Sequence, residues 1–295
     1  MTSYLHGVNN IRLSLCRLFN LFILMFKEPS DPTSYLVADH NVTKALEFLK
    51  KKNAEQSEVH LTMTHLFGHA IAWGLYKIRR DVGRLPWGYF RHAKEIGVTC
   101  LVDVEGGKDL VPVTIMDAHK MTLIEFAKAC SEKVQRAKNK KDKAHNESTK
   151  LFNYIPSFVA QPLMHTLTYL SGCCGLDFPA LGLKSTTFGH AVLTNIGMLG
   201  YDQGFAPIAP PMRCMGLFCT GKITKKPVVM ENDEIKIQSM MNVVSTGDHR
   251  FGDASIFTKM NKTMMGYVAD PANFDPTLYP ESPHYSELVA EKKSN

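Results

Sequence analysis

The sequence has no pair of cysteines with the C-x-x-C spacing of zinc and redox sites, although it contains seven cysteines in 295 residues. An odd number of cysteines also argues against a complete disulfide framework. A protein with a reduced interior therefore explains the cysteines best, and the sequence predicts no metal site.

The chain also lacks a strong excess of one charge. Its formal net charge is +6, and its densest basic stretch, residues 138–143, contains no aromatic side chains. Proteins that bind single-stranded nucleic acids usually combine basic grooves with aromatic rings that stack on the bases. The lysines are better explained as solvated surface residues, so we expect no nucleic-acid partner.

No apolar run is long enough to span a bilayer. The apolar run at residues 18–26 is too short, and no small-residue cleavage site follows it. Residues 1–27 contain no acidic side chain, which is typical of a mitochondrial presequence. Two other interpretations remain open: the segment is the first helix of the domain, or it is an apolar helix that lies on a membrane or a partner.

The composition is that of an ordinary globular protein, with 44% hydrophobic and 21% charged residues and no evident repeat. Alternating and β-branched segments predict strands, and helical periodicity predicts helices between them. We therefore predict an α/β fold, a two-layer sandwich of a mixed β-sheet covered by helices. Strands are expected at 35–38, 96–104, 110–115, 188–193, 215–223 and 235–244, and helices at 44–52, 60–79, 122–138 and 256–266.

Three segments are expected along the chain. Residues 1–30 are predicted to form an N-terminal apolar helix that packs on the core or on a partner. Residues 31–270 form the main domain, in which the apolar, proline-interrupted stretch 151–187 is a helical insertion. Residues 271–295 are rich in proline and are expected to be extended.

The most informative stretch lies between two apolar segments near the C-terminus and reads Gly247-Asp248-His249-Arg250-Phe251-Gly252-Asp253. Histidine is the side chain whose ordinary pKa lies nearest neutrality, so it can accept and return a proton at physiological pH. A nearby aspartate can orient the imidazole or anchor the loop that carries it. The motif therefore makes His249 a candidate for proton transfer.

A second pair of histidines, His65 and His69, is spaced four residues apart on one predicted helical face. This spacing suits zinc when a glutamate lies between the two histidines and a third ligand is present. Neither feature is found here, so we expect both histidines to have structural roles.

Several segments together resemble the catalytic domain of the 2-oxoacid dehydrogenase acyltransferases, which share a fold with chloramphenicol acetyltransferase. The family's Asp-His-Arg-x-x-Asp-Gly motif is similar to residues 248–254. Three further family blocks follow the same order and are similar to Asp109-Leu110-Val111-Pro112-Val113, Val192-Leu193-Thr194-Asn195-Ile196-Gly197 and Phe205-Ala206-Pro207-Ile208-Ala209-Pro210-Pro211. The resemblance covers roughly residues 12–268 and implies a chloramphenicol acetyltransferase-like fold.

The resemblance implies roles for three catalytic residues. His249 would deprotonate the attacking thiol, and Thr194, which stands where the family has serine, would donate a hydrogen bond to the oxyanion. Asp253 would form a structural salt bridge with an arginine of the first helix, for which Arg17 is the best candidate. If Arg17 has this role, its helix belongs to the fold and is not a discarded presequence.

Asp248, Arg250 and Asn195 also match the family's motifs. The resemblance implies that they support the catalytic residues without taking part in the chemistry.

The resemblance also implies coenzyme A or acyl-CoA as a substrate and a homotrimer with its active sites between subunits. The sequence shows no lipoyl domain and no subunit-binding domain, so we expect a stand-alone enzyme without bound lipoate or metal. The alternative is a catalytically silent subunit in a larger assembly or at a membrane surface, contacted through residues 18–26 and 151–187. A mitochondrial location is expected, with the cytoplasm as the alternative.

Overall fold

The computed structural model of the chain describes residues 31–103, 110–140, 157–179, 185, 187–209 and 212–274. Residues 1–32 and 33–295 form two units, and the description below concerns the second. The expected N-terminal helix and Arg17 lie outside the described residues.

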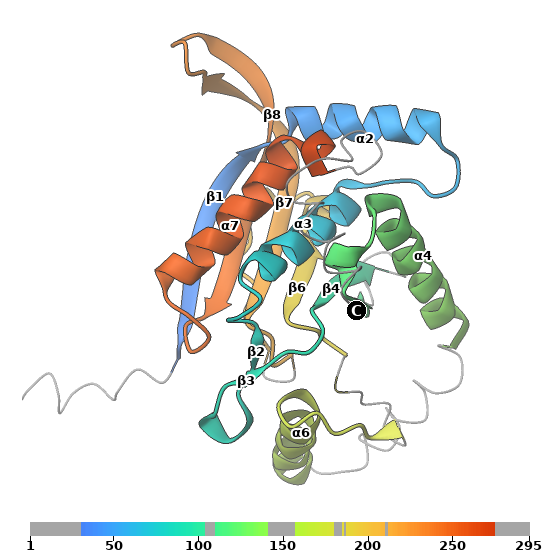
Figure 1. The fold of residues 1–295 in the computed structure, drawn as a ribbon, viewed down its shortest axis with the longest axis vertical. Helices are drawn as coiled ribbons and strands as arrows, with labels where there is room; N and C mark the ends of the chain where they lie inside the picture. Colours follow the sequence, from blue (N-terminus) through green and yellow to red (C-terminus); the bar gives the residue numbers. More distant parts are fainter. Residues whose placement is uncertain are drawn as a thin grey trace, which may run out of the picture. The chain divides into compact units, whose positions relative to one another are not determined.

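A six-stranded mixed sheet forms the centre of this unit, in the order β1-β8-β7-β6-β4-β5 (Figure 1). Strand β6 pairs in parallel with β4 and with β7, and the other pairs are antiparallel. The predicted α/β fold class is therefore confirmed. The strands are β1 (Thr33–Asn41), β4 (Gly97–Asp103), β5 (Leu110–Met116), β6 (Ala191–Asn195), β7 (Gly216–Val229) and β8 (Ile235–Asp248).

A layer of helices covers one face of this sheet (Figure 1). They are α2 (Thr43–Glu55), α3 (Met63–Lys77), α4 (Leu123–Lys140) and α7 (Ala254–Ala269). Helix α3 is the most apolar of them, and every residue from Leu66 to Tyr76 is buried. A helix that is buried on all sides needs no polar face. The main hydrophobic core therefore lies around α3, between the sheet and the other helices.

Two glycines allow α3 to pack this closely. A Cβ atom at Gly68 would lie 3.0 Å from the Cys100 sulfur in β4, and one at Gly74 would lie 2.7 Å from Cγ of Met264 in α7. Larger residues would push the helix away from its neighbours. Gly68 and Gly74 thus set the distances from α3 to the sheet and to α7.

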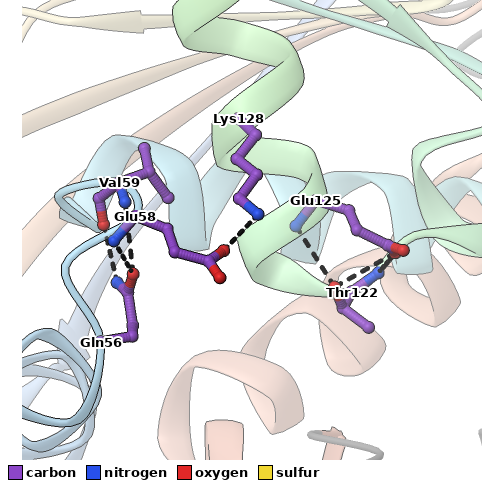
Figure 2. A network of polar contacts seen from close by, with 6 residues as sticks. All are labelled: Gln56, Glu58, Val59, Thr122, Glu125 and Lys128. Carbon is purple, nitrogen blue, oxygen red and sulfur yellow. Dashed lines mark hydrogen bonds and ion pairs between the residues drawn. The ribbon is translucent and has the colours of Figure 1, made fainter.

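Helix α4 begins with a capping box. The Thr122 hydroxyl accepts from the Glu125 N–H at 3.2 Å, and a Glu125 carboxylate oxygen accepts from the Thr122 N–H at 2.7 Å (Figure 2). Lys128 of α4 forms an ion pair with Glu58, in the loop that Gln56 folds by bonding to the backbone (Figure 2). This loop is thereby tied to the first turns of α4.

The expected helical insertion contains α6 (Ser157–Gly172), and a small hairpin that the sequence did not predict lies against it. The hairpin consists of β2 (Gly83–Arg84) and β3 (Arg91–His92). The Arg84 guanidinium donates to the carbonyl oxygens of Gly172 and Ser185. The Trp87 ring packs edge-on against Tyr169 of α6 at 5.3 Å. The hairpin thus fixes the end of α6.

Short 3-10 turns occur at η1 (Pro86–Gly88), η2 (Ala118–Lys120), η4 (Gly197–Leu199) and η5 (Pro271–Phe274). The last of these differs from the extended conformation expected after residue 270. Phe274 is buried, with its ring 4.8 Å from that of Tyr267 and 5.7 Å from that of Trp73. Burial of this ring explains the turn. None of the helices in the described segments has the length and hydropathy needed to cross a membrane.

Candidate active site

The Asp-His-Arg motif forms a tight turn at the end of β8. The Asp248 N–H donates to the Met215 carbonyl at 3.0 Å, and the Asp248 carbonyl accepts from the Phe251 N–H at 3.0 Å. The Asp248 carboxylate is buried and accepts hydrogen bonds from the backbone N–H and the guanidinium of Arg250. His249 therefore lies between two residues that are bonded to each other.

His249 is exposed to solvent and lines a cavity of about 190 Å³ between β1, β8 and α7. The cavity walls are mainly apolar. Its wall residues come from distant parts of the sequence, which is why the sequence did not identify them. Among them are Tyr35, Leu36, Met215, Phe257 and Asn261.

Asp253 is the N-cap of α7. Its Oδ1 accepts from the N–H groups of Ser255 and Ile256 at 3.0 and 3.1 Å, and from the Ser255 hydroxyl at 2.8 Å. The Ser255 hydroxyl bond, followed by the Ile256 N–H bond, lowers the pKa of Asp253. The side chain thus starts the helix that forms one wall of the cavity. The expected partner, Arg17, is outside the described residues.

Thr194 is not brought next to His249. Thr194 aligns with Cys219 of β7, and Cys219 aligns with Val244 of β8. His249 follows Val244 by five residues, which corresponds to about 16 Å along a strand. One copy of the chain therefore does not place both side chains against the same carbonyl group.

Asn195 connects the end of β6 to α3. Its amide nitrogen donates to the Thr64 hydroxyl at 3.1 Å, and its Oδ1 accepts from the Gly197 N–H at 2.9 Å. These bonds fix the end of the strand that carries Thr194. Asn195 thus bonds both to α3 and to the backbone that follows β6, and the two bonds hold the end of this strand in place.

The histidine pair on α3 makes structural contacts. His65 completes the capping box with Thr62. His69 is buried, with Nε2 2.9 Å from the Met121 carbonyl and Nδ1 2.7 Å from the Tyr267 hydroxyl. Because a carbonyl only accepts, Nε2 carries the proton and Nδ1 accepts from Tyr267. In the described part of the chain, no three His, Cys, Asp or Glu side chains are grouped to hold a metal ion.

Comparison with known protein families gives a match for the part of the chain that carries the Asp-His-Arg turn. Residues 180–274 match the model of the 2-oxoacid dehydrogenases acyltransferase (catalytic domain). A dihydrolipoyllysine-residue acetyltransferase component of the pyruvate dehydrogenase complex from Rickettsia felis is 22% identical over 270 residues, which is 90% of this chain and 53% of that protein. The chain thus spans about half the length of the curated relatives it matches.

Solved structures share the fold. A probable dihydrolipoamide acetyltransferase from Listeria monocytogenes has a TM-score of 0.60 at 16% identity, covering 81% of this chain and 85% of that one. The cubic core of a pyruvate dehydrogenase multienzyme complex has a TM-score of 0.59 at 16% identity, covering 88% of each chain. Both likenesses concern the arrangement of strands and helices.

The relatives also correct one expectation. Several of them are bacterial proteins from Rickettsia species, so the mitochondrial location expected from the acid-poor N-terminus was wrong. A shortage of acidic residues over a short segment is too weak a pattern to establish a presequence.

The segment 180–274 carries both Thr194 and the Asp-His-Arg turn, and its match to the catalytic-domain model agrees with the fold of the whole unit. The expected resemblance to the 2-oxoacid dehydrogenase acyltransferases is therefore confirmed by the match of residues 180–274 to the model of their catalytic domain.

Proposed function

We propose that this chain is the catalytic core of an acyltransferase that moves an acyl group between coenzyme A and a thiol acceptor. The observation that carries the proposal is the exposure of His249 in a cavity at the end of β8, within the segment that matches the catalytic-domain family. The relatives are dihydrolipoyllysine-residue acetyltransferases, which supports the same reaction class.

In this mechanism His249 removes the proton from the attacking thiol. A free thiol has a pKa of about 8.5, so it is mostly protonated at neutral pH, whereas the thiolate is the nucleophile. The thiolate adds to the acyl carbonyl and forms a tetrahedral oxyanion. As the intermediate collapses, the bond to the leaving sulfur breaks, and protonated His249 returns its proton to the thiolate that departs.

Thr194 is proposed to donate a hydrogen bond to the oxyanion. Because Thr194 and His249 of one copy are separated along the sheet, the hydroxyl has to come from a neighbouring copy. We therefore propose a homo-oligomer, most simply a homotrimer, with each site between two copies. The cubic-core relative is named as a multienzyme complex core, which is compatible with a larger assembly.

The remaining residues are proposed to hold the site in place. Asp248 and Arg250 fix the turn on either side of His249, and Asn195 fixes the strand of Thr194. Asp253 is proposed to combine its capping role with the expected salt bridge to Arg17. In both roles, Asp253 would hold the start of α7 close to the turn that carries His249.

The test is thiol-dependent acyl transfer. The purified chain is incubated with acetyl-CoA or longer acyl-CoAs and dihydrolipoamide, and the release of free CoA is followed. His249→Ala should abolish release, while His60→Ala, a change at an exposed histidine outside the cavity, should leave it unchanged. Transfer that persists in His249→Ala would contradict the role of this residue.

A second pair of variants tests the shared site. Thr194→Ser keeps the hydroxyl and should remain active, whereas Thr194→Val has a similar shape without the donor and should lose about a hundredfold in rate. Mixing the His249→Ala and Thr194→Val chains so that hetero-oligomers form should restore part of the activity. Restoration requires that the two residues act from different copies, so its absence in confirmed hetero-oligomers would contradict the proposed arrangement.

The second candidate function is structural: the chain would be a catalytically silent subunit of a larger assembly, or would bind to a membrane surface. It is favoured by exposed apolar side chains around α6, where Phe158 is 80% exposed, Trp87 71% and Tyr89 78%. Exposed apolar patches often mark interaction sites. A folded oligomer that releases no more CoA than its His249→Ala variant with every acceptor tried would favour this function.

A further inference from the structure

A second cavity, of about 370 Å³, lies at the same end of the sheet as the Asp-His-Arg turn. Backbone bonds link the two regions: the His190 carbonyl accepts from the Met215 N–H at 2.9 Å, and the Met215 carbonyl accepts from the Asp248 N–H at 3.0 Å. His190 lines the larger cavity, and Met215 lines the cavity of His249. The two cavities are therefore lined by residues that neighbour one another in one row of three strand ends.

The larger cavity is basic. Its charged lining residues are Arg84, Arg91, Lys94 and Glu95, which give a formal charge of +2. Three of these belong to the exposed surface, and Arg84 is half-buried. The cavity walls thus combine one half-buried cation, Arg84, with two cations that face solvent, Arg91 and Lys94.

Arg84 has no carboxylate within ion-pair distance among the described residues. Two of its five N–H donors are used, on the carbonyl oxygens of Gly172 and Ser185. Burial lowers the pKa of Arg84, since removal from water disfavours its charged form. An anion in the cavity would supply the missing counter-charge and acceptors for its remaining donors.

His190 adds a buried neutral donor. It is only 4% exposed, and its Nδ1 accepts from the Gly97 N–H at 3.1 Å. Nε2 therefore carries the proton of the neutral ring. Within the described segments this Nε2–H has no hydrogen-bond acceptor, although His190 lines the cavity. Burial, followed by the charge of Arg84, lowers the pKa of His190 to about 4, so the ring is neutral at pH 7.

We propose that this cavity binds a phosphate group of a ligand, held by Arg84, the His190 Nε2–H, Arg91 and Lys94. A dianionic phosphate complements the formal charge of +2, whereas a single carboxylate would compensate half of it. Charge-assisted bonds from guanidinium to phosphate are among the strongest in proteins. The phosphate belongs either to coenzyme A itself or to a separate phosphate-bearing acceptor, and in both cases it is bound beside the Asp-His-Arg turn.

The probe is inorganic pyrophosphate, titrated into the full chain by calorimetry without any turnover. Arg91→Gln and Lys94→Gln each remove an exposed charge from the cavity, and each should weaken pyrophosphate binding about tenfold. His190→Asn keeps an acceptor for the Gly97 N–H but removes the Nε2–H, so it should weaken binding to a similar extent. Lys50→Gln on α2 is the charge-matched control outside the cavity and should bind normally.

A parallel titration with coenzyme A identifies the source of the phosphate. If the cavity holds the phosphates of coenzyme A, pyrophosphate will compete with it and the same variants will weaken its binding. If the phosphate belongs to another ligand, coenzyme A and pyrophosphate will bind together and the variants will affect pyrophosphate alone. Failure of the folded native chain to bind pyrophosphate, or equal binding by the variants, would overturn the proposal. Neither result depends on whether His249 catalyses transfer.

Discussion

The Arg250 guanidinium donates to both carboxylate oxygens of Asp248, with its Nε 2.9 Å from Oδ1 and 3.1 Å from Oδ2. The hydrogen bond to Asp248 raises the pKa of Arg250. Because the carboxylate is buried and the two residues flank His249, their pairing restricts the backbone that carries the imidazole. The Asp248–Arg250 pair of the motif thus holds the turn on which His249 lies.

The first prediction concerns this pair. Asp248→Asn keeps an acceptor for the Arg250 N–H but removes the charge, so the turn should loosen and kcat for acyl transfer should fall about tenfold or more. The assay compares kcat with that of Glu132→Gln, which breaks an exposed helical ion pair far along the sequence. An unchanged kcat in Asp248→Asn would show that the charged pair does not position His249.

The second prediction separates the two roles proposed for Asp253. Asp253→Ala should lower the free energy of unfolding, because the N–H groups of Ser255 and Ile256 lose their acceptor. Asp253→Ser provides another capping oxygen and should restore most of this stability. The measurement is urea unfolding of all three chains, with acyl transfer assayed in parallel. If Asp253→Ser recovers stability but not activity, the carboxylate itself is needed, as the salt bridge to Arg17 requires.

Regular periodicity explains which elements could be predicted from the sequence. Burial alternates along residues 110–116, as in a strand with one buried face, whereas residues 97–100 are all buried and are recognised by their β-branched and apolar composition. Both strands lie where they were expected. The hairpin of β2 and β3 has only two residues per strand and a positive φ of 54° at Trp87, so it offers no period to detect. Strands β7 and β8 extend further than predicted, because residues such as Lys226 and Gln238 pair with each other away from the core.

The candidate site was predictable only where its residues are neighbours in sequence. Asp248, His249 and Arg250 share one turn, so a short motif identifies them. Tyr35 reaches the cavity because β1 pairs with β8 across more than two hundred residues, and no local pattern encodes that pairing. The basic cavity has the same origin, since Arg84 and His190 come from segments that only the fold brings together.

The third prediction concerns acid stability. Burial lowers the pKa of His69 and of His190 from 6.5 to about 4. The unfolded chain therefore binds more protons than the folded chain between these values, and stability is complete above pH 6.5 and declines as the pH falls towards 4. At pH 5 each histidine should cost about 2 kcal/mol relative to pH 7.

Urea unfolding at pH 7 and pH 5 measures this loss. In His69→Gln, which has no such group to protonate, the difference between the two pH values should be smaller than that of the native chain by about 2 kcal/mol. The variant should also be less stable at pH 7, because Tyr267 loses the acceptor Nδ1. Equal stability of the native chain at both pH values would contradict the neutral, buried state of these rings.

The fourth prediction uses two helical glycines with opposite surroundings. A Cβ at Gly74 of α3 would lie 2.7 Å from Cγ of Met264 and 3.1 Å from the Met260 carbonyl, so Gly74→Ala should force α3 and α7 apart and destabilise the chain by about 1–3 kcal/mol. Gly266 is exposed within α7, and a Cβ there would meet nothing within 4 Å. Gly266→Ala should therefore stabilise the chain by about 0.5–1 kcal/mol through helix propensity alone.

Thermal unfolding of the two variants should shift Tm in opposite directions. Since α7 also forms a wall of the His249 cavity, Gly74→Ala should reduce acyl transfer as well, and a Gly74→Ala chain with native Tm would contradict the close packing of these two helices.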